Sequence, residues 1–384
     1  MAEPVSSPLL SQDVPVQPEV NISEKIRMIE RKRRSRVLVY FLGTKPNLGT
    51  NIDPEQHRYI FEHLENIGKS KNIDLFLYTY GGDTLAPIRL CHLLREYCEK
   101  LSVLVPYKAM SSGTLICLGA NEIVMGKLGE LSPIDPTTGN HFNPPDSKEE
   151  KRIPISVEDV TSYLALAQDV AGIKGEDQTL EIFKDLTSPR KYSLHPLALG
   201  NVYRALRLIR DVAYKQLLTH HDEKETEKMK RIVTNLTELL YSHSYQISRK
   251  EAQELELKIV FPDSKLETMM WDLYKTYETK IDMLKPFDPG FIVNQAFNQL
   301  PPQPNITPNI QLPPNIPPQI AQAFQAQLAP PPSVTVPFTH EAAYIESFNI
   351  CHSFFISGEV KGKMNPQGTT DINVDIRGSW RRIR

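Results

Sequence analysis

A serine and a pair of glycines are the residues of this chain best placed to do chemistry, because each follows a short apolar run. The glycines are Gly81 and Gly82, in the segment LYTYGGDT (77–84), and the serine is Ser111, in AMSSGT (109–114). Paired glycines after a strand allow a tight turn and expose backbone N–H groups, which can stabilise the oxyanion of an acyl-transfer reaction. A serine at such a turn can act as a nucleophile, although it is more often only an N-cap. Together the two segments favour nucleophilic catalysis.

The surrounding pattern predicts a mainly parallel sheet that would hold both segments at one edge. Helical patterns separate the apolar runs, as in βαβ units. One helix is predicted to begin with Asp53 as its N-cap, and another follows Gly82 and carries Cys91 and Cys98 on its apolar face. A short helix is predicted over 114–120. The predicted buried strands are 37–42, 73–78, 101–105 and 123–125.

The rest of the chain divides by composition. Residues 156–241 are predicted to be nearly all helical, and capping boxes at 248–251 and 264–267 each predict a further helix start. No Lys, Arg, Asp or Glu lies between Asp288 and Glu341, and 301–337 hold 12 of the 31 prolines. We therefore expect a disordered lead-in (1–22), a main domain (23–288, helical over about 150–283), a linker (289–340) and a small β-rich tail (341–384) that docks on the main body, another subunit or a partner.

Charge and cysteine content exclude several classes of protein. The 44 basic and 46 acidic residues give a net charge of −2, which excludes a globally basic nucleic-acid binder. The basic run over 31–36 is interpreted as a solvated helix end. Four cysteines without C-x-x-C spacing argue against a disulfide scaffold or zinc ribbon, and His220-His221-Asp222 is interpreted as a solvated terminus rather than a metal site. With no signal peptide and no apolar run of ~18 residues, a soluble cytoplasmic protein is expected.

Further motifs follow the serine in a recognisable order. They are EIVMG (122–126), GELSPIDP (129–136) and YSHSYQI (241–247), which precedes Glu251 and Ala252. Over about 36–262 this succession resembles serine peptidases of the Clp protease/crotonase fold, and most closely the serine dehydrogenase proteinase (SDH) family, which is related to signal peptide peptidase A. The resemblance implies an α/β spiral of ββα units, a peptide or protein substrate, a homo-oligomer, and no metal or organic cofactor.

Carried over residue by residue, the resemblance gives Ser111 as the nucleophile and the amides of Gly81, Gly82 and Ser112 as the oxyanion hole. The general base stays open. No His stands where Clp proteases have theirs, and Ser244 stands where the SDH pattern has Asp. Lys151 fits the spacing of signal-peptide-peptidase relatives, and His243 is the other candidate.

Two alternatives to a peptidase remain. The chain could be an inactive scaffold that acts through its helical subdomain, linker and tail. It could also be a crotonase-like acyl-CoA enzyme, which would use the same oxyanion hole without a serine nucleophile. For the linker, we expect proteolysis to cut first within 289–340, leaving a stable fragment that ends near 286–291 and still reacts at Ser111.

Overall fold

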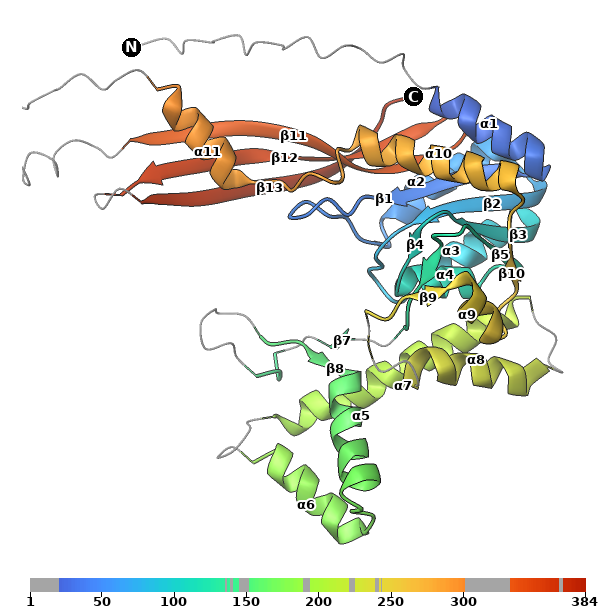
Figure 1. Cartoon of the computed structure of the whole chain (residues 1–384), viewed down its shortest axis with the longest axis vertical. Coiled ribbons are helices and arrows are strands. Elements are labelled where there is room, and N and C mark those ends of the chain that lie inside the picture. Colours follow the sequence, from blue (N-terminus) through green and yellow to red (C-terminus); the bar gives the residue numbers. More distant parts are fainter. Residues whose placement is uncertain are drawn as a thin grey trace, which may run out of the picture.

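The computed structural model of the 384-residue chain describes residues 21–134, 137–138, 141–144, 152–188, 194–220, 225–238, 242, 244–300, 332–365 and 369–384. Its centre is a sheet whose strands run in the order β10-β5-β3-β2-β1-β11-β12-β13 (Figure 1). The first five are parallel, and the last three join antiparallel to β1. In that order they are Ile259–Val260, Glu122–Met125, Cys98–Val105, Ser70–Tyr78, Arg36–Leu42, Ser333–Glu346, Cys351–Met364 and Thr370–Arg382. The predicted α/β class and parallel core are confirmed.

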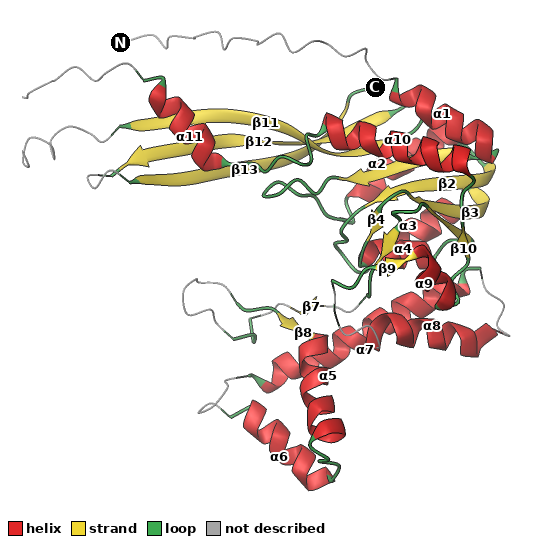
Figure 2. Cartoon of the chain, in the orientation of Figure 1, coloured by secondary structure: helices red, strands yellow, loops and turns green. Residues whose placement is uncertain are grey.

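Helices cover both faces of the parallel strands, which explains why these strands are apolar without alternation. Leu38, Tyr40 and Leu42 of β1 face the core formed with α2 (Gln56–Ile67), α3 (Ala86–Arg95) and α4 (Ser112–Leu118). The intervening residues of β1 face α1 (Ile22–Arg33) and α10 (Ser264–Lys280). Figure 2 shows α1 and α10 together on one side of the sheet.

Three local predictions need correction. The helix expected to begin with Asp53 as its cap begins at Gln56, because the Asp53 carboxylate accepts the Glu55 amide and forms a turn instead. Cys98 opens β3, since α3 ends at Arg95. Ser248 caps α9 (Arg249–Glu254) as predicted, but the cap of α10 is Asp263, whose Oδ1 accepts the Leu266 amide at 2.9 Å.

The basic run over 31–36 is not solvated throughout, because Arg33 within it forms ion pairs with two strands of the sheet. Arg33 binds Asp74 through Nε and Nη2, at 2.9 and 3.0 Å, and its Nη2 lies 2.8 Å from a Glu122 oxygen. Asp74 is only 1% exposed. Because a buried carboxylate needs a partner, the guanidinium ties α1 to β2 and β5.

The helical region predicted between 156 and 241 is present in its described parts. It contains α5 (Val157–Ala165), a π-helical turn (Leu166–Val170), α6 (Glu176–Leu186), α7 (Pro196–Leu218) and α8 (Thr226–Glu238), beside the short strands β7 (Thr137–Thr138) and β8 (Ile155–Ser156). Of the helices described in this region, α7 and α8 contribute to the central core, through residues such as Val212 and Met229. The buried Gln216 amide group fixes α7 by donating to the carbonyl oxygens of Pro87 and Leu115, each at 3.1 Å.

The stretch expected to be a linker begins and ends with regular structure. Residues Pro289–Asn298 form α11, and β11 already starts at Ser333, while 301–331 lie outside the described residues, as do 1–20. Val293 of α11 packs where Gly362 leaves space, since a Cβ there would come within 2.3 Å of it. The expected linker over 289–340 is therefore shortened at both ends by α11 and β11. The C-terminal tail contacts the main body through the pairing of β11 with β1.

Candidate active site

Ser111 lies at a tight turn between β4 (Lys108–Ala109) and α4. Its φ of 52° and ψ of −115° are unusual for a residue with a side chain, and such strained positions occur at catalytic nucleophiles held on a sharp strand-to-helix turn. β4 pairs with β6 (Glu130–Leu131), which in turn pairs with β9 (Ile247–Ser248). Residues of the GELSPIDP and YSHSYQI motifs therefore form the strands beside the one that leads to the serine.

Two buried hydroxyl groups hold this turn. Ser132 Oγ accepts the Ser111 amide at 2.7 Å, and its own amide donates to Thr114 Oγ1 at 3.1 Å. The Thr114 hydroxyl also lies 2.9 Å from the Ala109 carbonyl oxygen. The sequence motifs contained both residues but did not reveal these positioning roles, because they depend on contacts between separate segments.

The glycine turn lies directly against the serine. Gly81 and Gly82 have φ values of 112° and 149°, a region that residues with a side chain rarely adopt. A Cβ on Gly81 would come within 2.8 Å of the Ser111 Cβ and 3.2 Å of its Oγ, and a Cβ on Gly82 would come within 2.4 Å of the Ile52 carbonyl oxygen. Both glycines are therefore required by the close approach of other chain segments.

The three amides assigned to the oxyanion hole are not equivalent. The Gly81 amide donates to Thr79 Oγ1 at 2.9 Å. The amides of Gly82 and Ser112 have no hydrogen-bond partner within the described part of the chain. The buried Ser112 hydroxyl donates to the Gly82 carbonyl oxygen at 2.9 Å, which links the two segments. Two amides, those of Gly82 and Ser112, are thus available for an oxyanion, and Gly81 shapes the turn.

Neither candidate base can be placed, because Lys151 and His243 lie outside the described residues. Across the described ranges, the Ser111 hydroxyl has no hydrogen-bond partner. Lys108 is a described lysine close to Ser111 in sequence. Burial opposes its charge, but the hydrogen bond to the Tyr80 hydroxyl, at 3.1 Å, prevails and raises the pKa of Lys108 above its usual value. A lysine held charged in this way is a poor general base.

Other polar groups noted in the sequence have structural partners. His195 caps α7 by accepting the Leu197 amide at 3.1 Å, and His220 Nε2 lies 2.8 Å from the Leu118 carbonyl oxygen. His221 and Asp222 lie outside the described residues. No group of three or more His, Cys, Asp or Glu side chains within the described ranges is arranged to hold a metal ion.

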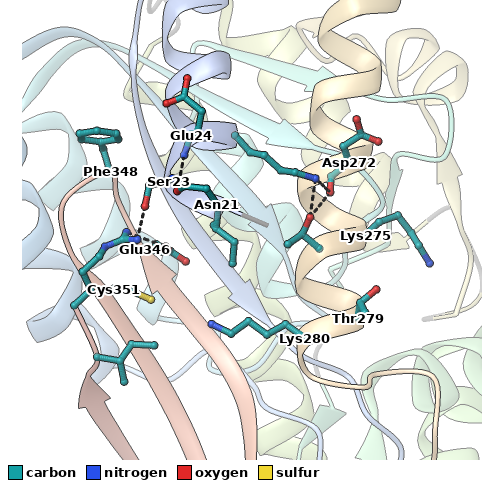
Figure 3. A pocket seen from close by; sticks show the side chains of 15 residues that line it. Asn21, Ser23, Glu24, Asp272, Lys275, Thr279, Lys280, Glu346, Phe348 and Cys351 are labelled. Atoms are coloured by element: carbon teal, nitrogen blue, oxygen red, sulfur yellow. Dashed lines mark hydrogen bonds and ion pairs between the residues drawn. The ribbon is translucent and has the colours of Figure 1, made fainter. Parts of the chain in front are cut away.

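A large pocket lies elsewhere, where the start of α1, the side of α10 and the C-terminal strands meet (Figure 3). Its volume is about 1130 Å³. Lys280, Glu346 and Cys351 are among the residues that line it, and no lining residue belongs to the glycine or serine segment. It is therefore separate from the candidate active site.

Among the described helices, none has both the length and the apolar character needed to cross a bilayer.

Comparison with known proteins finds relatives of this chain among curated proteins and solved structures. The chain is 26% identical over 263 residues to uncharacterized protein MJ0137 of Methanocaldococcus jannaschii, spanning 67% of this chain and 78% of that protein. It is 27% identical over 242 residues to uncharacterized protein MJ1495 of the same organism, spanning 61% and 70%. A solved structure of a variant of the 1510-N membrane-bound stomatin-specific protease matches with 14% identity and a TM-score of 0.32, covering 57% of this chain and 79% of that one.

The family comparison covers both segments of the candidate site. The family model for ClpP-like SDH-type serine proteinases matches residues 16–193, a range that includes the glycine turn and Ser111. The resemblance expected from the sequence is confirmed over residues 16–193, which match the model of the ClpP-like SDH-type serine proteinase family.

Proposed function

We propose that this protein is a serine peptidase that cleaves peptide bonds through an acyl-enzyme on Ser111. The observation that carries the proposal is the position of Ser111 at a strained turn, beside two amides without partners in the described chain, those of Gly82 and Ser112. The match of residues 16–193 to the model of a serine proteinase family supports the same chemistry.

The proposed reaction follows from these groups. Ser111 Oγ attacks the peptide carbonyl carbon and loses its proton to the general base, for which Lys151 and His243 are the candidates. The two amides stabilise the negative charge that develops on the carbonyl oxygen. The C–N bond then breaks, the base protonates the leaving amine, and water hydrolyses the ester bond to Ser111.

We also propose a cellular compartment and an oligomeric state for the enzyme. We place it in a cytoplasmic, reducing compartment, in line with its four free cysteines. We also propose that it works as a homo-oligomer, either without ATP or with the help of a partner protein. No metal or organic cofactor takes part in the proposed reaction.

Labelling with a fluorophosphonate probe tests the nucleophile. We expect the parent protein to be labelled and Ser111→Ala to be unlabelled and inactive, with unchanged unfolding, because a turn hydroxyl without a described partner adds little stability. Ser112→Ala is the comparison variant: it keeps the Ser112 amide but loses the hydroxyl bond to the Gly82 carbonyl oxygen, so it should still be labelled, at a lower rate. If Ser111→Ala keeps full activity and Ser112→Ala loses it, the nucleophile is assigned one position too early. A folded parent that no probe labels would favour the inactive scaffold.

A further inference from the structure

The outermost strand at the C-terminal side of the sheet, β13, presents a long free edge. It spans Thr370–Arg382, whereas the strand at the opposite edge, β10, has only the residues Ile259 and Val260. On its outer side no described strand pairs with β13, which follows the border of the three-stranded arm in Figure 1. Half of its backbone N–H and C=O groups therefore point away from β12, and such an edge is a template for pairing with another chain.

The side chains of β13 alternate between two characters over most of its length, with Thr370 and Arg382 as exceptions at its ends. The odd-numbered positions on one face are polar and mostly charged, and the even-numbered positions on the other face are mostly apolar. Ile372 and Ile376 are 42% and 50% exposed. The charged residues of the first face are Asp371, Asp375, Arg377 and Arg381, and the large apolar residues of the second are Ile372, Val374, Ile376 and Trp380.

This pattern is complementary to itself when the strand is reversed about Ile376. An antiparallel second copy centred there would place Asp371 opposite Arg381 and Asp375 opposite Arg377, each twice because of the two-fold symmetry. Opposite charges that face each other directly across an antiparallel pair stabilise it, and like charges destabilise it.

Neighbouring alignments lose this match. Centring the pair on Asp375 places that carboxylate opposite itself, and centring it on Arg377 does the same for two guanidinium groups. A slip by one residue places charged positions opposite apolar ones, for example Asp375 opposite Ile376. Centring on Val374 or Gly378 keeps one kind of opposite-charge pair, Asp371 with Arg377 or Asp375 with Arg381, whereas the alignment about Ile376 forms two kinds.

We propose that β13 pairs antiparallel with β13 of a second copy of this chain, in register about Ile376. The two eight-stranded sheets then join into one continuous sheet across the dimer. The proposal specifies the surface of the proposed homo-oligomer, and it does not depend on the chemistry of Ser111. Its test therefore measures mass and cross-linking rather than activity.

The charge pairs offer a test in which two variants rescue each other. Arg377 forms no ion pair within the described part of the chain, whereas Asp375 lies 2.5 Å from Lys361 Nζ on β12. Arg377→Asp places two carboxylates opposite each other at both ends of the symmetric pair, and Asp375→Arg places two guanidinium groups there. A mixture of the two variants restores an attractive pair at each place.

We expect light scattering coupled to gel filtration to give a dimer for the parent chain. Each single variant should raise the dimer dissociation constant by about tenfold or more, and the equal mixture should regain the parent value. Unfolding curves of the single variants check that the fold survives. A monomeric parent would overturn the proposal, as would two folded variants that dimerise as well as the parent.

Cross-linking tests the alignment independently. Ile376→Cys places the two sulfur atoms opposite each other across the two-fold axis, so mild oxidation should give a disulfide-linked dimer. Ile372→Cys is the matched control on the same face. Its two copies would lie roughly 27 Å apart, from eight residues at the rise of an antiparallel strand, and should stay unlinked. Cross-linking of both variants alike, or of neither, would overturn the alignment.

Discussion

Gly81 and Gly68 differ in why glycine is needed: Gly81 has both a positive φ and a close neighbour, whereas Gly68 has only the positive φ. Both have positive φ, 112° and 69°, but a Cβ on Gly81 would meet the Ser111 Cβ at 2.8 Å, whereas a Cβ on Gly68 would meet nothing within 4 Å. We expect Gly81→Ala to slow the labelling of Ser111 by about 100-fold, because the added methyl group displaces the nucleophile. Gly68→Ala should label at the parent rate and lose about 1–3 kcal/mol of stability from backbone strain. Labelling rates and denaturant unfolding measure both effects, and equal labelling of the two variants would contradict the placement of the glycine turn.

The general base gives a second prediction for single residues. A Lys151 base must be neutral to accept the proton of Ser111, so kcat/KM should rise as the pH passes through a pKa lowered by burial. A His243 base would place the rise near pH ~6.5 instead. We expect one of the two variants Lys151→Met and His243→Ala to lose activity without unfolding, and the pH profile of the parent to agree with that variant. If both variants stay active, the base comes from another residue, including one supplied by a second copy.

At the scale of elements, a buried histidine pair joins α2 to the C-terminal strands. His63 Nε2 lies 3.0 Å from His352 Nδ1, His63 Nδ1 lies 2.8 Å from the Ser347 hydroxyl, and His352 Nε2 lies 3.3 Å from a Glu62 oxygen. Burial, followed by electrostatic repulsion from the His352 ring and from Arg382 and Arg384 when His63 is protonated, lowers the pKa of His63 to about 3. Burial also lowers the pKa of His352, although Glu62 opposes this. Both rings are therefore neutral in the folded protein at pH 7.

The pair predicts a loss of stability in mild acid. Below the ordinary histidine pKa of about 6.5 the unfolded chain binds protons that the folded chain does not, so the free energy of unfolding falls as the pH falls. For His63 alone the loss is about 2 kcal/mol between pH 7.5 and pH 5. Denaturant unfolding at several pH values measures it. We expect His63→Gln to flatten the curve, and His92→Gln, at an exposed histidine, to leave it unchanged; an unchanged slope in His63→Gln would reject the assignment.

The elements that the sequence predicted well are those with strong local patterns. The apolar runs around Val39 and Phe76 identified the parallel strands, and Gly81 and Ser111 were recognised because each follows such a strand. The contacts between segments had no local signal. The bond from the Ser111 amide to Ser132 and the pairing of Arg33 with Asp74 depend on how the chain folds back. The prolines before β11 likewise concealed a strand whose partner, β1, lies about three hundred positions earlier in the sequence.

At the scale of the whole molecule, the C-terminal strands are part of the same folded unit as the candidate active site. β11 lies between β1 and β12, and Ala343 and Ile345 pack in the core cluster that contains Leu38 and Leu77. The buried Tyr277 hydroxyl of α10 donates to Glu346 at 2.7 Å. Removing these strands would expose the edge of β1, a strand buried on both faces. The structure therefore argues against the expectation that a fragment ending near residues 286–291 is stable by itself.

Cutting the chain and deleting its end should consequently have opposite effects. A recognition sequence for a site-specific protease, inserted within 301–331, allows the backbone to be cut while β11, β12 and β13 stay paired. We expect the two pieces to elute together in gel filtration, to separate only in denaturant, and to keep fluorophosphonate labelling at Ser111 at the rate of the uncut protein. A chain that ends at residue 300 lacks the partner of β1 and should aggregate or unfold at lower denaturant concentration. Separation of the cut pieces without denaturant, or a truncated chain as stable as the parent, would show that the C-terminal strands are an independent unit.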